Sequence, residues 1–378
     1  MKRRPALVAL VAAALVLPLG GCASWWPWSD KARIPELPQL VANSARVVWS
    51  VSLRKGGTGY QPAVVGNDVF VAAGDGTVMK VDGVNGAVAW QARSEKGVTT
   101  GVGSDGQLTA VADRQGTLLA FDANGRLSWS TTTGAAVTSV PEVGHGLVVV
   151  LTSDSRVQAF DAVSGQRRWV FSRQNPPLVL RQNVAVAIDA TTVYVGLPGG
   201  RLLGLALENG AVRWEAAVAV PKGSNEIERI ADVLGKPLLV GREVCAATFL
   251  GKVACFDGTT GRTQWSRDIQ AVGGLDGDER LVVAADDGGF VHGLSAGGAP
   301  LWREERLARR MLSAPLLLAD AVAVGDITGI VHLLGRADGA LVGRVTTDGS
   351  AIIAQPVRVG ELAVVQTSAG GLYAIAAR

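Results

Sequence analysis

Two histidines occupy the same place in two copies of one short pattern, which makes them the first candidates for metal chemistry. His292 lies in GFVHGLS and His332 lies in GIVHLLG. Imidazole is a common ligand, but a metal site needs several ligands close together. No clustered carboxylate or cysteine completes a set, so we expect both side chains to pack or to face solvent. Nucleophile elbows, phosphate loops and haem-attachment motifs are absent from the sequence, and we predict no catalytic residue, metal site or cofactor.

Cys245 and Cys255 could form a disulfide in an oxidising compartment. Cys255 takes a position that holds alanine or glycine in other copies of the pattern, so it also fits a small buried residue. One predicted hairpin separates the two cysteines, and the turn register decides whether they face each other. A disulfide and two buried thiols both stay open.

Cys22 ends an N-terminal leader of a recognisable kind. Residues 2–4 are basic, residues 6–19 are apolar, and Leu-Gly-Gly-Cys follows at residues 19–22. This order is typical of a secretory signal, and the apolar run is short for a membrane span. The last four residues resemble a bacterial lipobox, in which the cysteine is lipidated and becomes the first mature residue. We predict a signal peptide at residues 1–21 and a lipid on Cys22, with Ala23 favouring the outer membrane.

Residues 22–43 are rich in tryptophan and proline and have few strand signals. Such a segment is typical of a tether between a lipid and a folded domain. Trp25, Trp26 and Trp28 suit a membrane interface, and a disordered leader is an equally open interpretation.

One pattern recurs along the rest of the chain and decides the architecture. It reads AFDAVSGQRRW at residues 159–169, and its tryptophan returns at residues 49, 90, 129, 169, 214, 265 and 302. A period of about 40 residues is that of a four-stranded propeller blade. Short β-branched runs separated by Asn-Gly, Ser-Gly or Asp-Gly turns indicate antiparallel hairpins. We interpret the tryptophans as side chains that pack each blade against the next.

The two ends of the chain complete each other. The eighth third-strand run lies at residues 371–376 with no fourth strand behind it, and residues 46–51 form an orphan strand. Their pairing would close the ring and remove its free edges. We predict an all-β, eight-bladed β-propeller of four-stranded antiparallel blades at residues 44–378, closed by its N- and C-terminal strands.

Two connections are longer than the repeat requires, and such insertions often mark a binding face. The fourth tryptophan interval exceeds the period by about five residues and the fifth by about eleven. The first insertion contains Leu178, Leu180 and Arg181, and the acid-rich second contains Asp232. Both lead from an outer strand to the next blade, so we expect them side by side on one face as a protein-docking surface. Alternatively, both leucines belong to the next strand and Arg181 is solvated.

Charge gives no support to nucleic-acid binding. The 36 basic and 33 acidic residues differ by three, and residues 2–4 account for that excess. A mature chain near neutrality lacks the basic surface that nucleic acids require.

The leader, the repeats and the two inserted segments together resemble the BamB family of outer-membrane protein assembly factors, over the whole chain. The resemblance implies a non-catalytic lipoprotein on the periplasmic face of the outer membrane. Its implied partners are the POTRA domains of BamA in the BAM complex, with unfolded outer-membrane proteins as further candidates. It also implies that Leu178, Leu180, Arg181 and Asp232 contact the partner, whereas a second acid of the family is Leu234 in this sequence.

Two other classes stay open. The repeat also resembles that of pyrroloquinoline-quinone dehydrogenases, which have a vicinal cysteine pair, a calcium site and a longer chain. This sequence has no adjacent cysteines. The third interpretation is an envelope scaffold or sensor with another partner.

Overall fold

The computed structural model describes residues 34–53, 56–57, 60–174, 178, 184–221, 223–224, 230–249 and 251–377. The chain divides into two compact units, Met1–Ile34 and Pro35–Arg378, and Ile34 is the described part of the first. The second unit is built from strands. Its described residues contain no helix, and so none that is long and apolar enough to cross a membrane.

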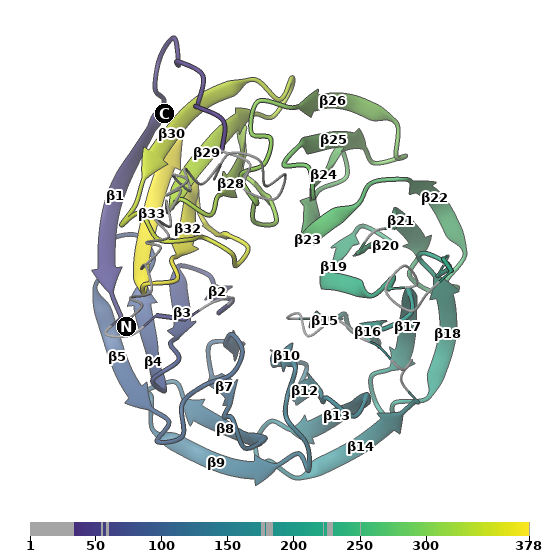
Figure 1. The fold of residues 1–378 in the computed structure, drawn as a ribbon. Helices are drawn as coiled ribbons and strands as arrows, with labels where there is room; N and C mark the ends of the chain where they lie inside the picture. Colours follow the sequence, from purple (N-terminus) through teal and green to yellow (C-terminus); the bar gives the residue numbers. More distant parts are fainter. Residues whose placement is uncertain are drawn as a thin grey trace, which may run out of the picture. The chain divides into compact units, whose positions relative to one another are not determined.

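The strands of the second unit form eight blades around a central axis (Figure 1). From the axis outward, blades 1 to 3 consist of β2 (Ala63–Val65), β3 (Asp68–Ala72), β4 (Thr77–Asp82) and β5 (Val88–Arg93); β6 (Gly103–Ser104), β7 (Leu108–Ala112), β8 (Thr117–Asp122) and β9 (Leu127–Thr132); and β11 (Glu142–Gly144), β12 (Leu147–Leu151), β13 (Arg156–Asp161) and β14 (Arg167–Ser172). Blades 4 and 5 consist of β15 (Val184–Ile188), β16 (Thr192–Leu197), β17 (Arg201–Ala206) and β18 (Val212–Ala217); and β19 (Val233–Val240), β20 (Glu243–Thr248), β21 (Val253–Asp257) and β22 (Thr263–Arg267).

The remaining blades follow the same order. Blades 6 and 7 consist of β23 (Ala271–Gly277), β24 (Leu281–Asp286), β25 (Val291–Ser295) and β26 (Pro300–Glu304); and β27 (Leu316–Leu317), β28 (Ala321–Gly325), β29 (Ile330–Gly335) and β30 (Leu341–Thr346). Blade 8 consists of β31 (Val357–Val359), β32 (Leu362–Gln366), β33 (Gly371–Ala377) and β1 (Ala45–Ser52). A short strand, β10 (Ser139–Val140), precedes β11.

The predicted closure is confirmed. The N-terminal strand β1 pairs antiparallel with β33, from Ala45 opposite Ala377 to Ser52 opposite Gly371. Figure 1 shows β1 in purple beside β33 in yellow. A blade assembled from both ends of the chain joins the last sheet to the first, so neither terminus leaves an unpaired strand.

Hydrophobic burial explains why the blades need one another. Each of the eight buried clusters is formed by two adjacent blades, as in the cluster of Leu147, Val149 and Leu205 from blades 3 and 4. One blade alone would leave both of its faces exposed, whereas the closed ring covers every face.

The tryptophans pack each blade against the next, as the sequence predicts. The ring of Trp129 lies against Gly165 in the turn of the following blade, where a Cβ atom would approach the ring to 2.7 Å. The indole Nε1 of Trp129 donates a hydrogen bond to the carbonyl of Ala162 at 2.9 Å. Equivalent indole bonds to the next blade are made by Trp49, Trp169, Trp214, Trp265 and Trp302.

Blade 7 has Gly343 in place of this tryptophan, and the N-terminal segment takes the vacated space. A Cβ atom at Gly343 would lie 2.9 Å from both the Ala45 nitrogen and the Ser44 Oγ. The Ser44 amide donates to the carbonyl of Val342 at 3.1 Å, and Asn43 Nδ2 donates to that of Arg344 at 3.0 Å. Gly343 has no side chain, and the N-terminal segment therefore packs against it just before the strand that closes the ring.

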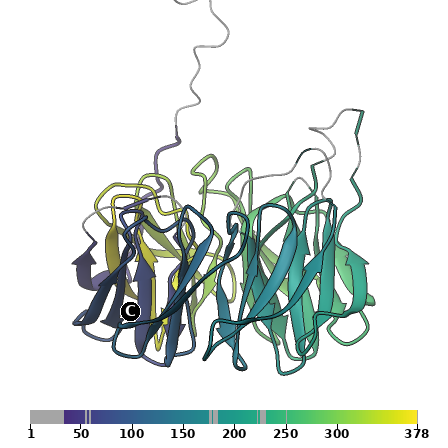
Figure 2. The same ribbon diagram turned by 90° about the horizontal axis from the view of Figure 1, so that it is seen from below.

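Antiparallel order places the connections on two faces. We call the face that carries the outer-to-inner connections and the turns between second and third strands the connector face. Backbone hydrogen bonds join the two kinds of loop there, as from Ser94 to Gly76 at 2.7 Å and from Thr133 to Gly116 at 2.9 Å. The other turns lie on the opposite face, and Figure 2 shows the strands running between the two.

The two cysteines left open by the sequence are joined. Cys245 on β20 lies directly opposite Cys255 on β21, and the two form a disulfide. Both side chains are buried between blades 5 and 6.

Candidate docking site

The two insertions lie on the connector face of adjacent blades. The first joins β14 to β15 and the second joins β18 to β19, so both run from an outer strand to the next inner strand. Their described ends meet around a hollow of about 380 Å³. Arg173 and Gln174 line it from the first insertion and Pro221 lines it from the second. The expectation that the insertions emerge side by side on one face is confirmed for these described ends.

The turn between β16 and β17 forms a wall of this hollow through Pro198 and Gly199. Gly200 has a φ of 73°, and a Cβ atom there would lie 2.3 Å from the carbonyl oxygen of Ala219. Only glycine fits this close approach in the left-handed region. The second insertion therefore holds the turn tightly.

Asp232 also holds the turn between β16 and β17 in place. Its Oδ1 accepts a hydrogen bond from the Gly199 amide at 3.0 Å, and its carbonyl accepts one from the Phe249 amide at 2.9 Å. The residue is 5% exposed. Asp232 thus ties the end of the second insertion to turns of blades 4 and 5.

Among the described residues at the hollow, positive charge is in excess. Glu215 Oε2 lies 2.8 Å from Arg173 Nη1, and its Oε1 lies 3.5 Å from Arg201 Nε. Two guanidinium groups share one carboxylate, and all three side chains are partly exposed. Ion pairs this exposed contribute little to stability, so the arginines remain available to an incoming carboxylate.

The inner strands below the hollow are joined across blades. In parallel pairing, β15 contacts β10 through Val184 and Ser139, and it contacts β19 through Val184 and Gly235. Lys236 Nζ also lies 2.7 Å from Glu142 Oε1, which links blade 5 to blade 3. These bonds connect three neighbouring blades at the base of the insertions.

The residues predicted to contact a partner have different placements. Leu178 is described and 42% exposed, whereas Leu180, Arg181 and the predicted lipidation site Cys22 lie outside the described residues. Asp232 is buried, and its hydrogen bonds give it a positioning role; its direct contact with a partner stays a prediction. The sequence carried no signal for this role, because Gly199 lies far from Asp232 along the chain.

Each histidine has one aspartate as a partner, and a single carboxylate beside an imidazole does not complete a metal ligand set. His292 Nε2 lies 2.7 Å from Asp286 Oδ2, and His332 Nε2 lies 3.0 Å from Asp326 Oδ2. Each aspartate precedes its histidine by one hairpin turn, which brings the two side chains together. Burial raises the pKa of Asp286, but the hydrogen bonds from His292 and the Phe290 amide, together with the charges of His292 and Arg303, leave that pKa below its usual range.

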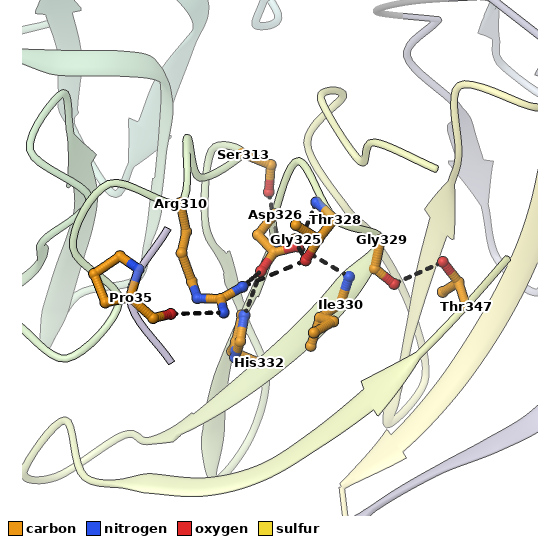
Figure 3. Close-up of polar contacts among 10 residues, drawn as sticks. All are labelled: Pro35, Arg310, Ser313, Gly325, Asp326, Thr328, Gly329, Ile330, His332 and Thr347. Carbon is orange, nitrogen blue, oxygen red and sulfur yellow. Dashed lines mark hydrogen bonds and ion pairs between the residues drawn. The ribbon is translucent and has the colours of Figure 1, made fainter. Parts of the chain in front are cut away.

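Arg310 completes a buried group around Asp326, with Arg310 Nη1 2.7 Å from Asp326 Oδ2 (Figure 3). Burial lowers the pKa of His332 and, together with the charges of Arg310 and Arg344, outweighs the opposing effect of Asp326. The buried Nδ1 of His332 has no hydrogen-bond partner among the described residues. Both facts favour a neutral imidazole whose Nε2–H donates to Asp326.

Potential metal ligands gather at one further place in the described chain, at Glu243, Cys245 and Cys255. The two sulfur atoms are bonded to each other. They therefore offer no thiolate, and a lone carboxylate makes no metal site.

The fold defines an eight-bladed β-propeller, in which the described ends of the two longer connections line one hollow on the connector face. The family model described as outer membrane protein assembly factor BamB matches residues 32–99 and 83–304. The chain belongs to the BamB family.

Individual relatives agree with this assignment. The outer membrane protein assembly factor BamB of Burkholderia pseudomallei is 40% identical over 380 residues, covering 99% of this chain and 98% of the relative. The crystal structure of BamB from Moraxella catarrhalis is 28% identical and superposes with a TM-score of 0.80, covering 88% of this chain and 99% of that one. A quinohemoprotein alcohol dehydrogenase from Comamonas testosteroni, 14% identical with a TM-score of 0.67 over 88% of this chain and 76% of its own, shares the fold alone.

Proposed function

We propose that the chain is a non-catalytic scaffold of outer-membrane β-barrel assembly, which docks the POTRA domains of BamA on its connector face. The observation that carries the proposal is the convergence of the described ends of both insertions on one hollow, with Leu178 exposed in the first insertion, in a chain of the BamB family. An enzyme is disfavoured because the dehydrogenase likeness concerns the fold, and a fold alone does not fix a function.

The chemistry of the hollow suits a protein surface. Pro198 and Pro221 offer apolar contact, and Leu178 offers an exposed anchor. Arg173 and Arg201 can each bind a carboxylate, and arginine is enriched where proteins meet. A partner that presents an apolar patch flanked by acidic side chains fits this arrangement.

The lipid anchor is the second part of the proposal. Cleavage after residue 21 would leave Cys22 as a lipidated N-terminus, with residues 22–43 as the tether and residues 44–378 as the propeller. Such an anchor would hold the ring on the periplasmic face of the outer membrane, where the POTRA domains would lie.

Co-purification from native membranes tests both parts. The full-length chain with a C-terminal affinity tag is extracted in mild detergent, and its companions and N-terminal mass are determined. The expected result is that BamA is recovered with the chain and that Cys22 is diacylated or triacylated. Recovery of an intact leader contradicts the lipid anchor. Recovery of the chain without BamA, at equal protein level, contradicts the docking. Dye reduction on addition of pyrroloquinoline quinone would favour the enzyme instead.

A further inference from the structure

Blade 7 contains a buried polar cluster that its own fold does not require, formed by Arg310, Asp326 and His332 (Figure 3). Asp326 Oδ1 accepts hydrogen bonds from within its own turn, from the amides of Thr328 at 2.8 Å and Ile330 at 3.0 Å. Its Oδ2 holds His332 and Arg310. Asp326 is fully buried and Arg310 is 6% exposed, so a whole ion pair is removed from solvent.

Comparison with other blades isolates Arg310 as the unusual member. Asp113 in blade 2 accepts the same kind of turn bonds, from the amides of Gln115 and Thr117 at 2.8 Å. Asp286 in blade 6 has such a bond together with a histidine. The aspartate turn is thus a feature of the repeat. Burying a guanidinium beside it costs desolvation free energy, which points to a role outside the turn.

That role is indicated by the N-terminal segment. Arg310 Nη2 donates a hydrogen bond to the carbonyl of Pro35 at 3.2 Å. Leu37 packs against the buried cluster of blades 6 and 7, which includes Leu307 and Leu312 from the same connection as Arg310. At its other end the segment is bonded to blade 7 through Asn43 and Ser44, so residues 35–44 are held at both ends.

We infer that the Arg310 cluster is a docking site for the chain's own N-terminal segment, and that docking sets which face of the ring is turned to the membrane. Arg310 lies in the connection from β26 to β27, on the connector face. Ala45, where β1 begins, pairs with Ala377 at the end of β33 and lies on the opposite face. The docked segment therefore crosses the height of the ring and leaves it on the connector face.

Docking of the N-terminal segment shortens the tether between the ring and the lipid. This step rests on the proposed lipid at Cys22. From Cys22 to Pro35 the chain spans at most about 45 Å, whereas from Cys22 to Ala45 it spans up to about 80 Å. Docking nearly halves the reach and moves the exit to the other face. The docking hollow of the two insertions then lies on the side of the ring nearer the lipid.

Docking itself is tested on the unlipidated mature chain with Cys22 replaced by Ser and a spin label at Gln39→Cys. We expect an immobilised label, which Arg310→Met or Leu37→Asp makes mobile. Leu37→Asp lies outside the strands of the ring, so it tests docking even where Arg310→Met fails to fold. Val41→Asp is the matched control, because Val41 is fully exposed in the same segment. A mobile label in the parent chain, or equal effects of Leu37→Asp and Val41→Asp, would overturn the docking site.

Orientation is tested with the lipidated chain in phosphatidylethanolamine–phosphatidylglycerol vesicles that contain an acceptor-labelled lipid. Donor dyes are placed on blade 2, at Gln115→Cys on the connector face or at Asn124→Cys on the opposite face. We expect stronger energy transfer from residue 115 and loss of this difference with Leu37→Asp. Equal energy transfer from both positions would overturn the proposed orientation. If the protein does not bind the vesicles, both the lipid anchor and the orientation are overturned. Partner capture is measured separately and can fail without affecting either result.

Discussion

Asp232 Oδ1 accepts a hydrogen bond from the Gly199 amide at 3.0 Å, which joins the second insertion to the turn that lines the docking hollow. Asp232→Ala would remove the acceptor of this partly buried hydrogen bond and destabilise the fold by about 1 kcal/mol. It should also weaken partner binding, because the wall of the hollow is loosened. Asp232→Asn retains the carbonyl oxygen and should change both quantities less. Urea unfolding and a binding titration of the two variants check this. Equal loss of binding in both, with stability unchanged, would instead indicate direct contact by the charge.

Two tryptophans offer a comparison of the interblade hydrogen bond. Trp129 Nε1 donates to the Ala162 carbonyl, whereas the buried Nε1 of Trp90 has no partner among the described residues. Trp129→Phe should therefore cost about 1 kcal/mol more stability than Trp90→Phe, since it alone breaks a bond. Chemical unfolding of both variants at one pH gives the difference. A larger cost at Trp90 would contradict the assigned bonding.

Features that repeat along the sequence could be predicted from it, whereas contacts between single residues of different repeats could not. The spacing of the tryptophans and of the glycine turns predicted the blades. The orphan strand around Trp49 predicted the closure. The partners of Asp232 and Arg310 lie in other repeats or in the N-terminal segment, where spacing carries no information. The pairing of Cys245 with Cys255 needed a turn register, which the structure supplies.

Acidification should destabilise the ring through blade 7. Burial raises the pKa of Asp326, but bonds from His332, Thr328 and Ile330 outweigh it and leave that pKa far below its ordinary value. Burial lowers the pKa of His332, with contributions in the same direction from Arg310 and Arg344.

Both groups thus bind fewer protons when folded than when unfolded, so stability falls as pH falls. The part due to His332 should be lost below about pH 6.5 and the part due to Asp326 below about pH 4. His332→Gln keeps a donor and copies Gln158 of blade 3, so it should flatten the free energy of unfolding between about pH 7 and 5. Urea titrations across this range measure it. An unchanged slope in the variant would exclude His332 as the source.

The disulfide should be present in the exported protein and should stabilise blade 5. Cys245 and Cys255 are ten residues apart in sequence, and closing a loop of this size contributes about 2–3 kcal/mol. The double variant Cys245→Ala, Cys255→Ala should unfold at lower urea, and reductant should shift the parent but not the variant. Thiol labelling under denaturing, non-reducing conditions checks the bond. Two free thiols in periplasmic protein would refute it.

Capture of the BamA POTRA domains by purified variants tests the central proposal most directly. Leu178→Asp places a charge on an exposed side chain of the first insertion, and Arg181→Glu reverses a charge in the same insertion. Val163→Asp is the control, because Val163 is an exposed apolar residue on the opposite face of blade 3. We predict at least about tenfold weaker binding for both insertion variants, which corresponds to about 1.4 kcal/mol, with unfolding midpoints unchanged. Wild-type binding by both insertion variants, or an equal loss with Val163→Asp, would contradict the account.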